Sequence, residues 1–193
     1  MMTMLPASES QATSANRTPP QRYLLLGCCL LACLLADPIW AKGQAQERLL
    51  KAAFVYNFAK FTQWPTSSFS DGEASLNLCL IGQDGLNGDL RRLDGRLVKG
   101  RTLRVKALDG NTLPDSCHMA YIARSEGSGL ARQLAGRPVL SISQISRFSR
   151  SGGIIELYRR NGKIRFRINR SAAQRAGLSI SSRLLKLADV VGG

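Results

Sequence analysis

Two cysteines and one histidine are the residues best suited to chemistry beyond the N-terminal apolar run. Cys79 and Cys117 lie far apart, and His118, the only histidine, follows Cys117 directly. Because the N-terminus predicts export, an even pair of cysteines predicts a disulfide, worth roughly 4 kcal/mol for a loop of this length. Two buried free thiols are the alternative. A bridged cysteine offers no thiolate and three ligands do not complete a zinc site, so we expect a structural histidine and no metal.

Other catalytic combinations are poorly represented. Gly82, Gly85 and Gly88 follow an apolar run, but Asp84 stands where a dinucleotide-binding loop needs its second glycine. No G-x-S-x-G motif surrounds any serine. Carboxylates are too scarce after Ser116 for a two-carboxylate site. We therefore expect a protein that is not an enzyme and that needs no cofactor.

Several residues are better candidates for binding. Tyr56 and Trp64 are of the types that anchor binding interfaces, although core packing is the alternative at their spacing. Glu156 is a solitary acid that we expect to pair with Arg150, Arg159 or Arg165.

A crevice beyond the carboxyl ends of the strands is a second possibility for binding, because open α/β sheets commonly hold small ligands there. Its candidate residues, for a pocket or an interface, are Tyr56, Asn169 and Arg183.

Residues 1–41 read as a secretory signal peptide, and residues 42–193 as a single domain. About thirteen largely apolar residues follow Arg17 and Arg22, fewer than the roughly 20 that a membrane-spanning helix needs. Ala41 offers a small-residue cleavage point. A lipoprotein signal with Cys33 as the lipidated residue is the less favoured alternative, and either signal predicts a periplasmic protein.

The net charge of the 193-residue chain is +14, and residues 42–193 carry all of it. From Cys117 onward the chain has fourteen Lys or Arg residues and three acidic residues, which gives this part a net charge of +11. This asymmetry is typical of nucleic-acid binding, but export argues against such a partner. We expect instead a solvated basic face that steers the protein toward an acidic protein or membrane surface.

The apolar pattern predicts a single layered α/β domain with a mostly parallel central sheet and helices on its faces. An amphipathic helix is expected over Glu47–Phe61 and ends near Pro65. Short apolar runs predict buried strands joined by crossovers, at Leu76–Ile81, Leu103–Ala107, Met119–Ala123 and Val139–Ile142.

The C-terminal third predicts an antiparallel hairpin. Gly153–Arg159 and Lys163–Ile168 flank Arg160-Asn161-Gly162, and Asn-Gly is a strong hairpin signal. A short helix over Arg170–Ala176 and a last helix capped by Ser181 or Ser182 follow. The apolar residues to Val191 are expected to form the packing face of that last helix.

The order of motifs resembles the YfiR family. The family's opening helix is similar to Lys51–Pro65, and its two cysteine-bearing segments are similar to Leu78–Gly82 and Cys117–Ile122. The remaining matches are Gly136–Ser143, Gly152–Asn169 and Ala176–Leu185, so the resemblance spans residues 47–189.

The resemblance implies a periplasmic negative regulator that binds and inhibits an inner-membrane diguanylate cyclase and so controls cyclic di-GMP and biofilm formation. An OmpA-like outer-membrane lipoprotein would sequester it, and a homodimer is left open. A small-ligand binding module without a cyclase partner is the alternative. Relatives under redox control carry a second cysteine pair near the glycine hairpin, whereas this chain has no cysteine after Cys117.

Overall fold

An eight-stranded, curled sheet forms the centre of the folded part of the chain, and most neighbouring strands run parallel. The computed structural model describes residues 39–69, 75–109, 113–126 and 129–192. Residues 41–193 form one compact unit. The predicted α/β class is confirmed, with a mostly parallel sheet, helices and an antiparallel strand pair.

The large sheet has the strand order β10-β8-β7-β6-β5-β2-β4-β3. Only β7 with β8 and β3 with β4 are antiparallel neighbours in it, and a separate short pair joins β1 to β9. The strands are β1 (Thr62–Gln63), β2 (Ser75–Ile81), β3 (Leu97–Val98), β4 (Arg101–Leu108), β5 (Met119–Ile122), β6 (Leu140–Ser143), β7 (Ile155–Arg160), β8 (Lys163–Asn169), β9 (Ser179–Ile180) and β10 (Asp189–Val191).

The helices are short, apart from the first one described. They are α2 (Ile39–Phe61), α3 (Asn87–Arg91), α4 (Gly129–Gln133), α5 (Arg170–Arg175) and α6 (Ser182–Leu185), with 3₁₀ turns η1 (Thr66–Ser68), η2 (Arg124–Glu126) and η3 (Phe148–Ser151). Among the described residues, no helix combines the length and apolarity needed to cross a bilayer.

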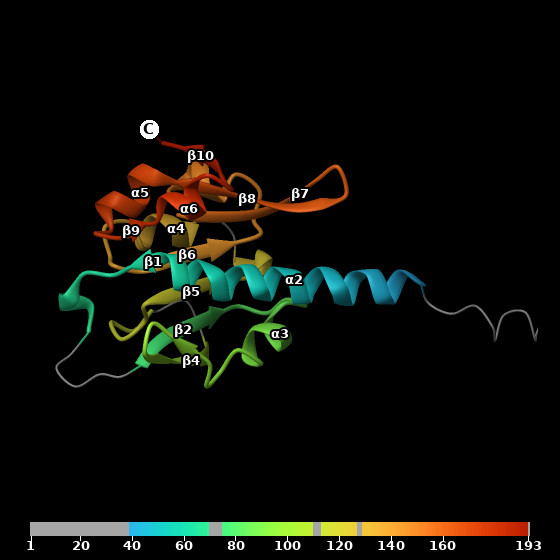
Figure 1. Ribbon diagram of the computed structural model, residues 1–193, viewed down its shortest axis with the longest axis horizontal. Helices are drawn as coiled ribbons and strands as arrows, with labels where there is room; N and C mark the ends of the chain where they lie inside the picture. The colour runs from blue at the N-terminus through green and yellow to red at the C-terminus, as the bar shows by residue number, and fades with distance from the viewer. Residues whose placement is uncertain (1–38, 70–74, 110–112, 127–128, 193) are drawn as a thin grey trace, which may run out of the picture. The chain divides into compact units, whose positions relative to one another are not determined.

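Helix α2 lies along one face of the sheet (Figure 1) and buries its apolar stripe there. Val55 and Phe58 are fully buried, and the Phe58 ring centroid lies 5.0 Å from that of Phe166 in β8. The helix starts earlier than the predicted Glu47. The predicted cleavage point after Ala41 therefore falls in its first turn and stays a prediction.

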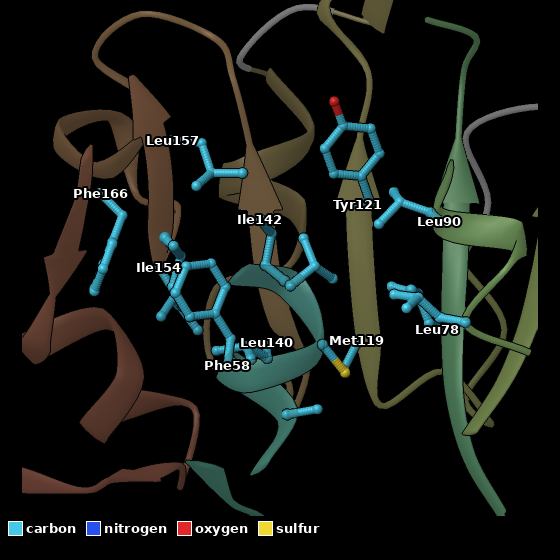
Figure 2. Packing of buried hydrophobic residues seen from close by; sticks show 14 of the residues in the cluster. Phe58, Leu78, Leu90, Met119, Tyr121, Leu140, Ile142, Ile154, Leu157 and Phe166 are labelled. Atoms are coloured by element: carbon cyan, nitrogen blue, oxygen red, sulfur yellow. The ribbon is translucent and has the colours of Figure 1, made fainter. Parts of the chain in front are cut away.

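The main apolar cluster occupies the space between α2 and the sheet. Figure 2 shows Phe58 reaching toward the strands, with Leu140 and Ile142 of β6 and Met119 of β5 beside it. Parallel strands buried on both faces read as continuous apolar runs, which explains why β2, β5 and β6 were predictable. All four residues of β5 and of β6 are buried.

A second cluster covers the opposite face of the sheet. Leu130 and Ala131 of α4 pack there with Phe148 of η3. The predicted disulfide lies in this layer and joins Cys79 in β2 to Cys117, with their Cα atoms 6.0 Å apart. Both cysteines are buried.

The hairpin of β7 and β8 follows the prediction closely. Its turn consists of Asn161 and Gly162, with φ of 50° and 72°, as the two-residue type I′ turn requires. Phe166 and Ile168 are buried on the face toward α2, whereas Lys163 and Arg165 are exposed on the other. The apolar and cationic faces expected for this strand are both present.

The prediction of a last helix running to Val191 is wrong. Ser181 caps α6 through its hydroxyl, which accepts a hydrogen bond from the Leu184 amide at 3.3 Å, but the helix ends at Leu185. The chain then forms β10, where Val190 and Val191 pair in parallel with Ile168 and Asn169 of β8. Pairing with an otherwise open strand edge satisfies backbone groups of both strands and outweighs the helical spacing of the leucines.

Candidate functional site

A cationic pocket lies at the carboxyl edge of the sheet, between the first half of α2 and the β7–β8 hairpin. Its volume is about 410 Å³. The parallel strands β5 and β6 end beside it; Gln144 follows β6 directly, and Arg124 follows β5 after Ala123. The lining residues are Glu47, Lys51, Arg124, Gln144, Ser146, Glu156, Leu157, Tyr158 and Arg159. This is the position at which open α/β sheets commonly bind ligands.

A chain of hydrogen bonds connects this pocket to the core. The Tyr121 hydroxyl donates to Asp84 Oδ2 at 2.6 Å and accepts from Gln144 Nε2 at 2.7 Å, and Lys51 Nζ donates to Gln144 Oε1 at 2.6 Å. Burial, and next the Asp84 carboxylate, raise the pKa of the Tyr121 hydroxyl far above its ordinary value, so it remains a donor. Figure 2 shows this hydroxyl directed out of the apolar cluster.

Glu47 connects α2 to the hairpin across the pocket. Its carboxylate lies 2.6 Å from Lys51 Nζ and 3.2 Å from Arg159 Nη1. The hydrogen bond from Lys51 lowers the pKa of Glu47, against the opposing effect of burial. The pocket therefore holds an ionised Glu47 whose charge is shared by two cations.

Replacing Glu47 with Gln is expected to destabilise the fold at neutral pH, by less than about 1 kcal/mol because the pair is partly exposed. The folded-state pKa lies below the ordinary 4.5, so the stabilisation is complete above about pH 4.5 and is lost as pH falls through the folded value. Urea unfolding of wild type and Glu47→Gln from pH 3 to 7 measures this. The two curves should converge at low pH, whereas the uncharged change Gln46→Ala should give a constant offset. A Glu47→Gln difference that persists at low pH would contradict the assignment.

Glu156 is a buried carboxylate with four hydrogen bonds. Its Oε2 accepts from the amide and the hydroxyl of Ser149, at 3.1 and 2.6 Å. Its Oε1 accepts from the Arg147 amide at 3.2 Å and from Arg167 Nη1 at 3.1 Å. Arg147 has a left-handed φ of 62°, so the carboxylate holds a backbone conformation that costs energy.

The predicted partner of Glu156 is therefore wrong. The expected partners were Arg150, Arg159 or Arg165, but the ion pair is with Arg167, directly opposite on β8. The two-residue turn places Arg160 opposite Lys163, and this register carries Glu156 to Arg167.

Asn169 of β8 contacts the same turn, η3. Its Nδ2 donates to the Ser149 carbonyl at 2.7 Å, and its Oδ1 accepts from the Ala172 amide at 2.9 Å, which caps α5. Gly153 lies beside this turn, where any β-carbon would overlap the Phe148 ring. Glu156 and Asn169 are thus brought together around η3, and both organise the fold there.

Tyr56 and Trp64 lie near the opposite, amino edge of the sheet. The Tyr56 hydroxyl donates to the Leu97 carbonyl at 2.8 Å, and Trp64 Nε1 donates to the His118 carbonyl at 2.9 Å. Trp64 lines a pocket of about 280 Å³ with Phe69, Lys99 and other residues. Neither this pocket nor the cationic pocket is lined by Tyr56, Asn169 or Arg183, and Arg183 is exposed on α6.

His118 is a buried structural residue. Its Nδ1 accepts from the Asn77 amide at 3.0 Å, while Nε2 lies 2.9 Å from the Ser68 carbonyl, so the proton is assigned to Nε2. The Phe69 ring stacks on it with centroids 4.5 Å apart. Within the described residues, no group of three or more His, Cys, Asp or Glu has the arrangement of a metal site.

Sequence reasoning missed Lys51, Arg124, Gln144 and Arg159 as pocket residues. A signal for two of them was present, because Arg124 and Gln144 come within two residues of the carboxyl ends of predicted strands, Met119–Ala123 and Val139–Ile142. Lys51 and Arg159 reach the same place from α2 and from β7. Their positions depend on the packing of the helix and the hairpin.

Fold and site define a class of small, disulfide-bonded α/β protein with a cationic pocket at the carboxyl edge of its sheet. The chain belongs to the YfiR/HmsC-like family, DUF4154, whose model matches residues 48–189. The match confirms the resemblance seen in the sequence. The family consists of periplasmic, non-catalytic proteins that act in general as regulators of diguanylate cyclases.

Proposed function

We propose that this protein is a periplasmic negative regulator that binds and inhibits an inner-membrane diguanylate cyclase, and so lowers cyclic di-GMP and biofilm formation. The family match over residues 48–189 carries the proposal. A signal peptide over residues 1–41 would deliver the domain to the periplasmic side of the cyclase. An OmpA-like outer-membrane lipoprotein would relieve the inhibition by sequestering the regulator.

Deleting the gene is expected to raise cellular cyclic di-GMP several-fold, because the cyclase would lose its inhibitor. Mass-spectrometric measurement of the nucleotide in the deletion strain tests this. The full chain should restore the low level, whereas residues 42–193 expressed without the export signal should not. Unchanged cyclic di-GMP under several growth conditions would contradict inhibition, and rescue by the unexported chain would contradict a periplasmic site of action.

The alternative function, small-ligand binding without a cyclase partner, is favoured by one observation, the cationic pocket of about 410 Å³ at the carboxyl edge. An anionic metabolite would suit Lys51 and Arg124 there. At 100 times its dissociation constant, such a ligand stabilises a protein by about 2.7 kcal/mol. A thermal-shift screen of small carboxylates and phosphates tests this, with Arg124→Gln as the control that should lose the shift.

A further inference from the structure

Strand β7 has one edge, on the side of β6, that is paired for only part of its length. β6 pairs with β7 at two positions, Ile142 with Ile155 and Ser143 with Glu156. β7 continues to Arg160 and pairs with β8 throughout. Figure 1 shows the hairpin running on past the end of β6. Among the described residues, the other edge of residues 157–160 has no strand beside it.

The hydrogen-bond pattern shows which backbone groups face this open edge. The Asn169 amide donates to the Ile154 carbonyl at 2.8 Å, which makes residues 154 and 169 a hydrogen-bonded pair. Because such pairs alternate along an antiparallel ladder, Tyr158 and Arg160 also bond to β8. The backbone groups of Leu157 and Arg159 therefore point away from β8. The parallel pairing of Ser143 with Glu156 takes up the Leu157 N–H, so the Leu157 C=O and the N–H and C=O of Arg159 face the open edge.

The cationic pocket borders this edge. Leu157 and Arg159 line it together with Lys51 and Arg124. The two carboxylates of the pocket are already neutralised, since Glu47 is bound by Lys51 and Arg159, and Glu156 by Arg167. Arg124 is exposed and donates to the Gln144 carbonyl at 3.3 Å. The surplus positive charge of the pocket is thus available to an incoming acidic group.

We propose that the open edge of β7 accepts an extended, acidic segment of a partner protein as an added strand. Its backbone would pair with the Leu157 C=O and with the N–H and C=O of Arg159, and its carboxylates would bind Arg124 and Lys51. Four residues of strand span roughly 13 Å, at about 3.3 Å per residue. Free strand edges are templates for such pairing, in which backbone bonds give affinity and side chains give specificity.

Charge favours this occupant over a second copy of the chain. Residues 42–193 carry +14, so two copies would repel at a cationic edge, whereas an acidic segment would be attracted. The inference holds for any protein that supplies the strand and does not depend on that protein being a cyclase. Its failure is therefore distinguishable from failure of the cyclic di-GMP experiment.

Amide hydrogen exchange by NMR tests the pairing directly. The probe is a capped six-residue peptide of alternating glutamate and valine. With saturating peptide, exchange at the Arg159 amide is expected to slow at least about tenfold, because this amide becomes bonded only in the complex, whereas the Leu157 amide is already bonded to β6. The Tyr158 and Arg160 amides, already paired with β8, should change little. Absence of added protection at Arg159 with low-millimolar peptide would overturn the proposal.

A matched pair of variants distinguishes the contribution of the backbone N–H of residue 159 to peptide binding from the contribution of the Arg159 charge. Arg159→Pro and Arg159→Gln both remove the cation, but only proline removes the outward N–H, and proline is tolerated at such edge positions. Arg159→Pro is expected to bind the peptide at least about tenfold more weakly than Arg159→Gln. A peptide of alternating lysine and valine should not bind either protein. Equal affinities for the two variants would overturn strand addition, and if Arg159→Pro does not fold, the exchange pattern of the wild type decides.

Discussion

Replacing Glu156 with Ala is expected to lower the free energy of unfolding by about 3–5 kcal/mol. The change leaves Arg167 without its carboxylate, and it removes the acceptor for the Arg147 amide and for the Ser149 amide and hydroxyl. These groups lie in a buried turn, so water cannot replace the lost bonds at no cost. Urea unfolding followed by circular dichroism measures the change.

The control for this prediction is a carboxylate in an exposed ion pair. Asp115 lies 2.9 Å from Arg137 Nη2 and its side chain is fully exposed, so Asp115→Ala should leave the free energy of unfolding nearly unchanged. A Glu156→Ala cost as small as that of Asp115→Ala would contradict the structural role. If Glu156→Ala loses partner binding, damage to the η3 turn is a sufficient explanation. Arg124→Gln is the variant that tests the pocket, because it leaves η3 unchanged.

Removing the disulfide is expected to cost about 4 kcal/mol. The bridge joins Cys79 to Cys117 across 38 positions and restricts the unfolded chain by that loop, in the chain-entropy account. The double variant Cys79→Ala with Cys117→Ala replaces both thiols with small apolar side chains, as suits their buried layer. Urea unfolding of the two proteins in non-reducing buffer measures the difference.

Reduction is the control for the disulfide. A reductant should bring the wild type close to the double variant, leave the variant unchanged, and release no metal. Mass spectrometry that finds both thiols free in protein isolated from the periplasm would contradict the bridge as a native feature. A cost below about 1 kcal/mol would show that the unfolded chain is already restricted in another way.

Local sequence signals predicted most of the fold. Continuous apolar runs marked β2, β5 and β6, and Asn161-Gly162 marked the hairpin. The last segment was wrong because the leucine spacing suits a helix, and only the unpaired edge of β8 makes a strand more favourable. Such long-range competition is absent from a local pattern.

The candidate site was only partly predictable. Glu156 and Asn169 were singled out and do meet, but their shared target is the backbone of η3, which no spacing indicates. The pairing of Glu156 with Arg167 could have been predicted from the sequence, because a two-residue turn fixes every cross-strand pair of the hairpin. Lys51 and Arg159 could not be placed without the packing of α2 against the hairpin.

The lateral borders of the large sheet end in very short strands, three residues in β10 and two in β3. They pair with three residues of β8 and two residues of β4, and so shorten the edges at which further copies could add. Fibril-like stacking of copies is thereby discouraged at both flanks of the molecule. The unpaired part of β7 lies instead in the interior of the strand order, beside positive charge, so an added strand there would have to be acidic.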